Sequence, residues 1–204
     1  MNRSARRFTS PAARRVIRAL PPLLIASAAV GLAACPAAAE RLEFDRTQFL
    51  AGQWSRLLTG HLVHFGPSHL VWDVVTFAGL GVVAFVKDAR RSLAAIASAA
   101  VAIPLAIVLL QPNLQTYRGL SGLVCALFGV LAGLLIRERR DAASLLGLAM
   151  VGFIAKSVYE SAAGHAFFVQ STGSFVPVPL AHVVGVACGL LAAVAWQGRD
   201  AHAT

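Results

Sequence analysis

Charged side chains are scarce in this sequence of 204 residues. Asp, Glu, Lys and Arg make up 13% of the chain, hydrophobic residues make up 57%, and the mean hydropathy is +0.70. A soluble domain of this size could not bury so much apolar surface, so the composition indicates a protein that lies in a lipid bilayer. The chain has 18 Lys and Arg but only nine acidic residues, and in a membrane protein this excess indicates the orientation in the bilayer. We expect no nucleic-acid partner.

Cysteine is nearly absent, because the chain has only Cys35, Cys125 and Cys188. All three lie in apolar stretches and no two have CxxC spacing, which excludes a disulfide-stapled secreted domain and a zinc ribbon. We expect them to be small packing residues, and we expect neither a metal nor a cofactor.

Long apolar runs separated by short charged or turn-rich segments fill nearly the whole chain. The sequence predicts an all-α membrane protein of six transmembrane helices, with a basic tail at 1–18, the bundle at 19–197 and a short tail at 198–204. The predicted spans are 19–39, 57–86, 92–110, 119–136, 142–163 and 178–196.

The basic residues predict the orientation of this bundle. The N-terminal tail, the alternate connections and the C-terminal tail together carry thirteen Lys and Arg, whereas the opposite connections carry four. Both termini are therefore expected in the cytoplasm, with loops 40–67, 111–118 and 164–177 facing outward.

The first span has a second interpretation as a cleavable signal peptide. Ala37-Ala38-Ala39 precedes Glu40, and Leu32-Ala33-Ala34-Cys35 is similar to a lipoprotein cleavage box. Removing the segment would leave five spans, so we favour a retained helix.

Ionisable or nucleophilic groups inside spans are expected to have a partner or a function. Lys156 and Glu160 lie four residues apart and can neutralise each other, so we assign them no chemistry. The other such residues are Asp73, Ser121 and His182.

Ser121 and His182 are expected at one depth. Sixteen residues separate Ser121 from Arg137 and seventeen separate His182 from Arg199, so both lie about 24 to 26 Å above the inner boundary at 1.5 Å per residue. Small residues recur every fourth position on both spans, which lets the two helices approach closely. They are Ser121, Cys125, Gly129 and Gly133, and Ala181, Gly185, Gly189 and Ala193.

If these two grooves face each other, Ser121 meets His182. A serine bonded to a neutral imidazole is an activated nucleophile for acyl transfer. The alternative is structural, with Ser121 as a packing residue and His182 as a helix-to-helix hydrogen bond.

Four local motifs bear on this choice. Gly119-Leu120-Ser121-Gly122 resembles the nucleophile motif of the rhomboid family of intramembrane serine proteases, and Ala181-His182-Val183-Val184-Gly185 resembles its base motif. His64 and His69 are similar to the family's histidine pair, and Trp54-Ser55-Arg56 to its first-loop Trp-Arg pair. The motifs follow family order over 53–196, which implies a rhomboid-like bundle.

Within that family, His69-Leu70-Val71-Trp72-Asp73 is similar to the rhombosortase subgroup. That resemblance implies a sorting protease of the bacterial inner membrane whose active site faces the periplasm. Its implied partners are the lipid bilayer and membrane-anchored protein substrates with a C-terminal Gly-Gly motif. Nothing in the sequence specifies an oligomeric state.

The resemblance also implies roles for individual residues. Ser121 is the nucleophile and His182 the general base, while His69 and the backbone N–H of Ser121 stabilise the oxyanion. Gly119 keeps the turn before Ser121 open. Arg56 orients the outer loop, and His64 and Gly185 have supporting roles. The fifth span and 164–177 form the gate and cap.

Two positions depart from the family pattern. Cys125 replaces a tyrosine that stacks on the base, and Asp73 replaces an oxyanion asparagine. Asp73 is either protonated and a donor, or ionised and an acceptor from His182 or His69. We favour the second, because a contact with His182 would compensate for Cys125. Asp73→Asn leaves turnover nearly normal in the first case and lowers kcat strongly in the second.

Two other classes remain open from the sequence. One is a rhomboid-like protein that binds transmembrane helices without cutting them. The other is a metal or proton transporter that uses His61, His64 and His69, although no two of these lie four residues apart. Labelling of Ser121 by a fluorophosphonate is expected only of the protease.

Overall fold

The computed structural model describes residues 10–138 and 178–195, together with Ser144, Leu148, Val151, Gly152, Ala155 and Tyr159. The expected Lys156–Glu160 pair and the predicted cap at 164–177 lie outside the described residues, as does most of the predicted fifth span.

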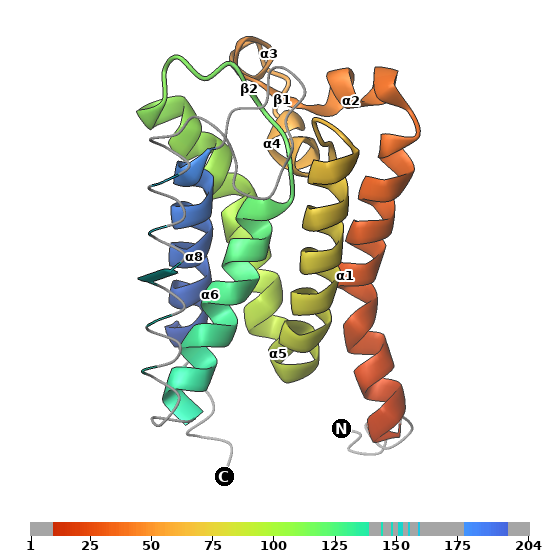
Figure 1. Ribbon diagram of the computed structural model, residues 1–204, viewed down its shortest axis with the longest axis vertical. Helices are drawn as coiled ribbons and strands as arrows, with labels where there is room; N and C mark the ends of the chain where they lie inside the picture. Colours follow the sequence, from red (N-terminus) through yellow and green to blue (C-terminus); the bar gives the residue numbers. More distant parts are fainter. Residues whose placement is uncertain are drawn as a thin grey trace, which may run out of the picture.

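Long helices form the body of the molecule and run roughly along its long axis (Figure 1). Three of the described helices are long and apolar enough to cross a membrane, namely α1 (Pro11–Ala33), α5 (Pro67–Leu110) and α6 (Ser121–Glu138). A shorter apolar helix, α8 (Pro179–Val194), lies beside α6. This arrangement agrees with a helical membrane bundle.

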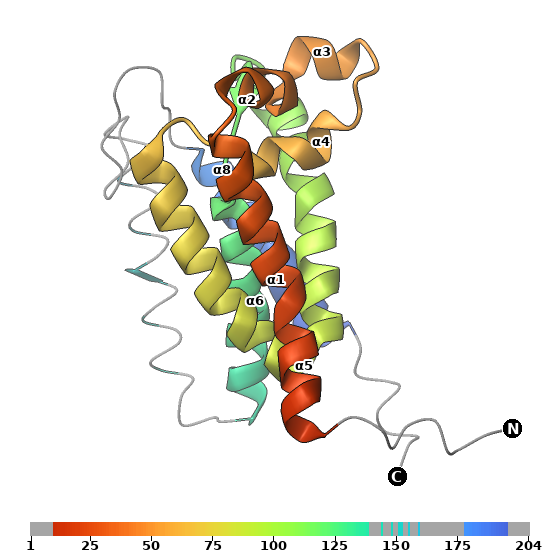
Figure 2. The same cartoon turned by 90° about the vertical axis from the view of Figure 1, so that its right-hand side faces the viewer.

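Helix α5 consists of two helical limbs joined at a kink. Its 44 residues would extend about 66 Å if straight, which is roughly twice the hydrocarbon thickness of a bilayer. Asp88 breaks the helix with φ −150° and ψ 90°, and its carboxylate accepts the backbone N–H of Arg91 at 3.0 Å. Asp88 thus caps the second limb, and the two limbs form a hairpin (Figures 1 and 2).

Both ends of the predicted first span and the start of the predicted second span differ from the structure, and α1 ends at Ala33 instead of residue 39. Helix α1 begins at Pro11, inside the predicted tail, because Ser10 accepts the N–H of Ala13 and proline suits a first turn. Helix α5 begins at Pro67 rather than at 57, because the preceding residues form separate short helices. Helix α1 packs on the first limb of α5, where Pro22 lies directly against Gly81.

Short elements gather at one end of the bundle, which we call the loop-rich end (Figures 1 and 2). They include one antiparallel pairing, in which Phe44 lies opposite Tyr117 and Asp45 opposite Thr116. The elements are α2 (Pro36–Leu42), β1 (Phe44–Asp45), α3 (Arg46–Leu50), α4 (Arg56–Thr59), η2 (Gly60–Leu62) and β2 (Thr116–Tyr117).

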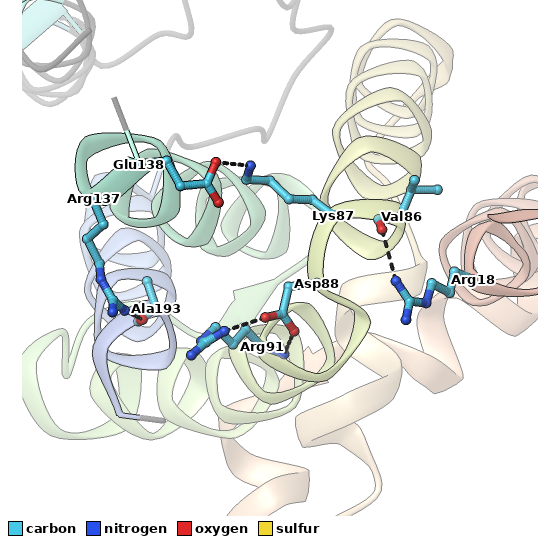
Figure 3. A network of polar contacts seen from close by, with 8 residues as sticks. All are labelled: Arg18, Val86, Lys87, Asp88, Arg91, Arg137, Glu138 and Ala193. Carbon is cyan, nitrogen blue, oxygen red and sulfur yellow. Dashed lines mark hydrogen bonds and ion pairs between the residues drawn. The ribbon is translucent and has the colours of Figure 1, made fainter. Parts of the chain in front are cut away.

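Polar contacts join the helices at the opposite end (Figure 3). Lys87 pairs with Glu138 and so links α5 to α6, while Arg137 donates to the Ala193 carbonyl of α8 at 2.9 Å. Arg18 of α1 donates to the Val86 carbonyl at 3.2 Å. The two arginine contacts give carbonyls near helix ends donors that they lack within their own helices.

The closest helix contact joins α6 to α8 through the small residues that the sequence analysis identified. A Cβ atom added at Gly129 would lie 2.5 Å from the Val186 carbonyl oxygen, and one added at Gly185 would overlap the Gly122 carbonyl. Gly133 likewise faces Ala193. The prediction that the two grooves face each other is therefore confirmed.

We predict that Gly129→Leu and Gly185→Leu each destabilise the bundle, because a large side chain must separate two backbones in contact. Overpacking of this kind costs at least about 1–3 kcal/mol. Thermal unfolding in detergent measures the change. Gly79→Leu is the matched control, because an added Cβ at Gly79 would have no atom of the described residues within 4 Å. Equal melting of all three variants would contradict this packing.

Candidate active site

Ser121 and His182 meet between α6 and α8. The Ser121 Oγ lies 3.1 Å from His182 Nε2, which is hydrogen-bonding distance. Ser121 is the first residue of α6 and His182 lies in the first turn of α8, so both belong to helix ends near the loop-rich end. The two side chains therefore lie at one level of the bundle, and their depth in a membrane stays a prediction.

The turn before Ser121 depends on Gly119. Its φ is +121°, a conformation that L side chains rarely adopt, and an added Cβ would lie 2.8 Å from His69 Nε2. Its N–H donates to the Gly60 carbonyl at 3.2 Å, and its own carbonyl accepts the Tyr117 hydroxyl at 3.2 Å. The chain between β2 and α6 is thereby fixed against the outer loop.

Asp73 lies beside this turn, and its Oδ2 is the centre of a compact polar cluster. The Ser121 backbone N–H donates to Oδ2 at 3.0 Å. The Nε2 atoms of His64 and His69 each lie 3.2 Å from the same oxygen. All three side chains are nearly inaccessible to solvent. Sequence reasoning selected His64, His69 and Asp73, but it did not predict that they converge on one atom.

For an ionised Asp73 we considered two partners, His182 and His69, and the structure distinguishes between them. Asp73 contacts His69, and among the described residues its partners are His64, His69 and Ser121, not His182. Asp73 is therefore not the third member of a Ser-His-Asp triad with Ser121 and His182. The reason is geometric, because Asp73 and His69 lie four residues apart on one face of α5 whereas His182 approaches Ser121 from α8.

A stack of side chains joins His69 to the outer loop. The Phe65 ring lies parallel to the His69 ring, with centroids 6.2 Å apart and 10° between the planes. The Arg118 guanidinium lies 4.9 Å from the Phe65 centroid and forms an ion pair with Glu43 at 2.7 Å. Sequence reasoning missed these contacts, although Arg118 directly precedes the Gly119 motif.

Arg56 is the first residue of α4 at the loop-rich end (Figure 1). Its Nη1 donates to the Glu43 carbonyl at 2.7 Å and its Nε to the Gln53 side chain at 2.7 Å. The residue is buried, and these bonds fix α4 against the segment that leads into β1. The orienting role of Arg56 in the first loop stays a prediction.

Two further polar residues lie at the loop-rich end, and of these the sequence analysis named only His61. Arg46 donates to the carbonyls of Ile107, Val108, Gln111 and Leu114, and so caps the end of α5. His61 Nε2 lies 3.1 Å from the Ala100 carbonyl. Burial lowers the pKa of His61 to about 4, so the imidazole is neutral and donates to that carbonyl. It does not join His64 and His69 at Asp73.

Cys125 and Gly185 lie where α6 and α8 touch. Cys125 is buried, and its Cβ would lie 3.1 Å from a Cβ added at Gly185. Gly185 is three residues beyond His182, so its missing side chain lets the first turn of α8 approach α6. This contact sets the separation of Ser121 and His182.

Comparison with protein families agrees with this geometry. The family model of the Rhomboid domain matches residues 51–198, which is most of the chain. The chain therefore belongs to the rhomboid family. Members of that family are typically intramembrane serine proteases that act on membrane-anchored substrates, and some members are inactive. No curated protein matches the chain.

We predict that Gly119→Ala lowers activity by about 100-fold, the effect of losing one oxyanion donor. The added methyl group would displace His69 and Asp73, which lie 2.8 and 3.0 Å from its position. Gly52→Ala is the matched control, because Gly52 also has a positive φ, +97°, but nothing within 4 Å. Initial rates of substrate cleavage compare the two. Equal cleavage rates in the two variants would show that a side chain placed against His69 at residue 119 does not affect activity.

Proposed function

We propose that this protein is an active intramembrane serine endopeptidase, with Ser121 as nucleophile and His182 as general base. The observation that carries the proposal is the 3.1 Å approach of Ser121 Oγ to His182 Nε2 across two separate helices. A hydroxyl placed against an imidazole is the minimum arrangement for acyl transfer. Both groups are retained, unlike in a protein that only binds transmembrane helices.

Acylation begins when His182 Nε2, unprotonated in the neutral tautomer, takes the Ser121 hydroxyl proton. Oγ then attacks the carbonyl carbon of the scissile peptide bond and forms a tetrahedral intermediate. As the C–N bond breaks, His182 returns the proton to the leaving amine. A water molecule, activated by the same imidazole, hydrolyses the acyl-enzyme and restores Ser121.

The oxyanion forms beside the first turn of α6. The Ser121 backbone N–H and His69 Nε2 are the proposed donors, since both point to one small volume next to Gly119. Donors held in place before the reaction stabilise developing charge without reorganising. Gly119 allows the approach, and the stack of Phe65 and Arg118 holds the His69 ring.

Substrate class and orientation follow from the rhombosortase resemblance and the charge distribution. We infer cleavage of membrane-anchored proteins with a C-terminal Gly-Gly motif, at the outer face of a bacterial inner membrane. Both termini are then cytoplasmic, which the thirteen basic residues on one side support. The fifth span and 164–177 are the proposed gate and cap, and the reaction uses no cofactor.

We predict that Ser121→Ala and His182→Ala each reduce cleavage to background, because each removes one half of the dyad. Both changes shrink a side chain, so the bundle should still fold. The measurement is cleavage of a Gly-Gly-tailed transmembrane substrate by purified protein in liposomes. Ser98→Ala is the control, because its hydroxyl donates to the Ala95 carbonyl within α5. Retained cleavage by either dyad variant would contradict the proposal.

A further inference from the structure

The Asp73 carboxylate occupies the position that a reaction oxyanion needs. Its Oδ2 accepts the Ser121 N–H at 3.0 Å and lies 3.2 Å from His69 Nε2. These are the two proposed oxyanion donors, and hydrogen-bond donors that converge on one oxygen define where an oxyanion binds. An added Cβ at Gly119 would lie 3.0 Å from Oδ2, so the oxygen is held against the turn.

An ionised carboxylate cannot serve as a third donor at this place. It only accepts hydrogen bonds, and it would repel a second negative charge at the same position. While Oδ2 holds the Ser121 N–H, that donor is not available to substrate. The site therefore has its nucleophile and base in place but its oxyanion hole filled.

His64 offers the carboxylate another partner. Its Nε2 lies 3.2 Å from Oδ2, and its side chain is 2% exposed. In the part of the chain that the structure describes, neither ring nitrogen of His64 makes a hydrogen bond of good geometry. A small rotation of the Asp73 side chain would improve the contact with His64 and release Ser121.

We propose that the Asp73 carboxylate is a resident anion in the oxyanion hole and keeps the protease latent. The carbonyl group of the substrate displaces this carboxylate from Ser121 and His69 toward His64. This inference rests on the proposed function and concerns regulation of the same site. It also changes the expectation for Asp73→Asn. A neutral amide holds the donors more weakly and can itself donate, so reactivity rises instead of falling.

The test measures the rate at which a fluorophosphonate modifies Ser121 in the full chain in liposomes. We expect Asp73→Asn and Asp73→Ala each to raise the second-order rate constant at least about tenfold, a conservative fraction of one donor's usual effect. Asp88→Asn is the matched control on the same helix, where the carboxylate contacts Arg91. Its rate should equal that of the wild type.

The role of His64 is tested in two backgrounds. His64→Phe should slow modification of the wild-type protein, because the carboxylate loses its second partner. In the Asp73→Asn background the same change should have little effect, because no anion needs to move. A purely structural role for His64 would slow both backgrounds equally and would overturn the displacement step.

Failure of this inference is distinguishable from failure of the proposed function. If Ser121 is modified in the wild type but both Asp73 variants react at the same rate or more slowly, the resident-anion proposal is wrong. If Ser121 is modified in none of the proteins, the serine-protease proposal is wrong as well. Thermal unfolding of each variant shows whether a slow rate reflects lost structure.

Discussion

The contact between α6 and α8 determines the geometry of the site. Ser121 and His182 belong to different helices, so their 3.1 Å separation exists only because the backbones approach closely below them. Gly129 and Gly185 leave no room for a side chain between the helices. In a membrane, where hydrophobic burial does not favour helix association, such backbone packing supplies much of the attraction. A change in the groove therefore acts directly on the nucleophile and base.

The loop-rich end fixes the other half of the site. The Gly60 carbonyl holds the Gly119 N–H, while Arg56 and Arg46 bind backbone carbonyls of the loop and of α5. Near a bilayer these backbone carbonyls have few other hydrogen-bond donors, and an unpaired carbonyl is costly there. The loop thus positions the turn before Ser121, and through Phe65 it also positions His69. The α6–α8 contact thus places Ser121 against His182, whereas the loop-rich end positions His69 and the turn before Ser121.

Regular features of the helices could be predicted from the sequence. A rise of 1.5 Å per residue places Ser121 and His182 at one depth, and the four-residue spacing of small side chains identifies the contact surface. The partners of Asp73 could not be predicted in this way. They depend on the path of the non-helical chain between β2 and α6, which Gly119 sets with a positive φ. Arg46 was missed for a similar reason, since its target is the end of a distant helix.

The start of α1 illustrates a local signal that hydropathy overlooks. The Arg-rich segment is too polar to be predicted as a span, but Ser10 and Pro11 form a good helix beginning, so the helix extends into it. Asp88 is the opposite case. The charged cluster around it lies where the structure divides α5 into two limbs, and the non-helical conformation at this point is confined to Asp88.

The central claim is that the α6–α8 contact makes Ser121 a nucleophile. The most direct measurement is mass-spectrometric mapping of the adduct that a fluorophosphonate forms with the wild-type protein in a bilayer. In the wild-type protein we expect a single modified peptide, which carries the adduct on Ser121. In His182→Ala we expect no adduct. An adduct that persists on Ser121 without His182, or the absence of any adduct on Ser121, would contradict it.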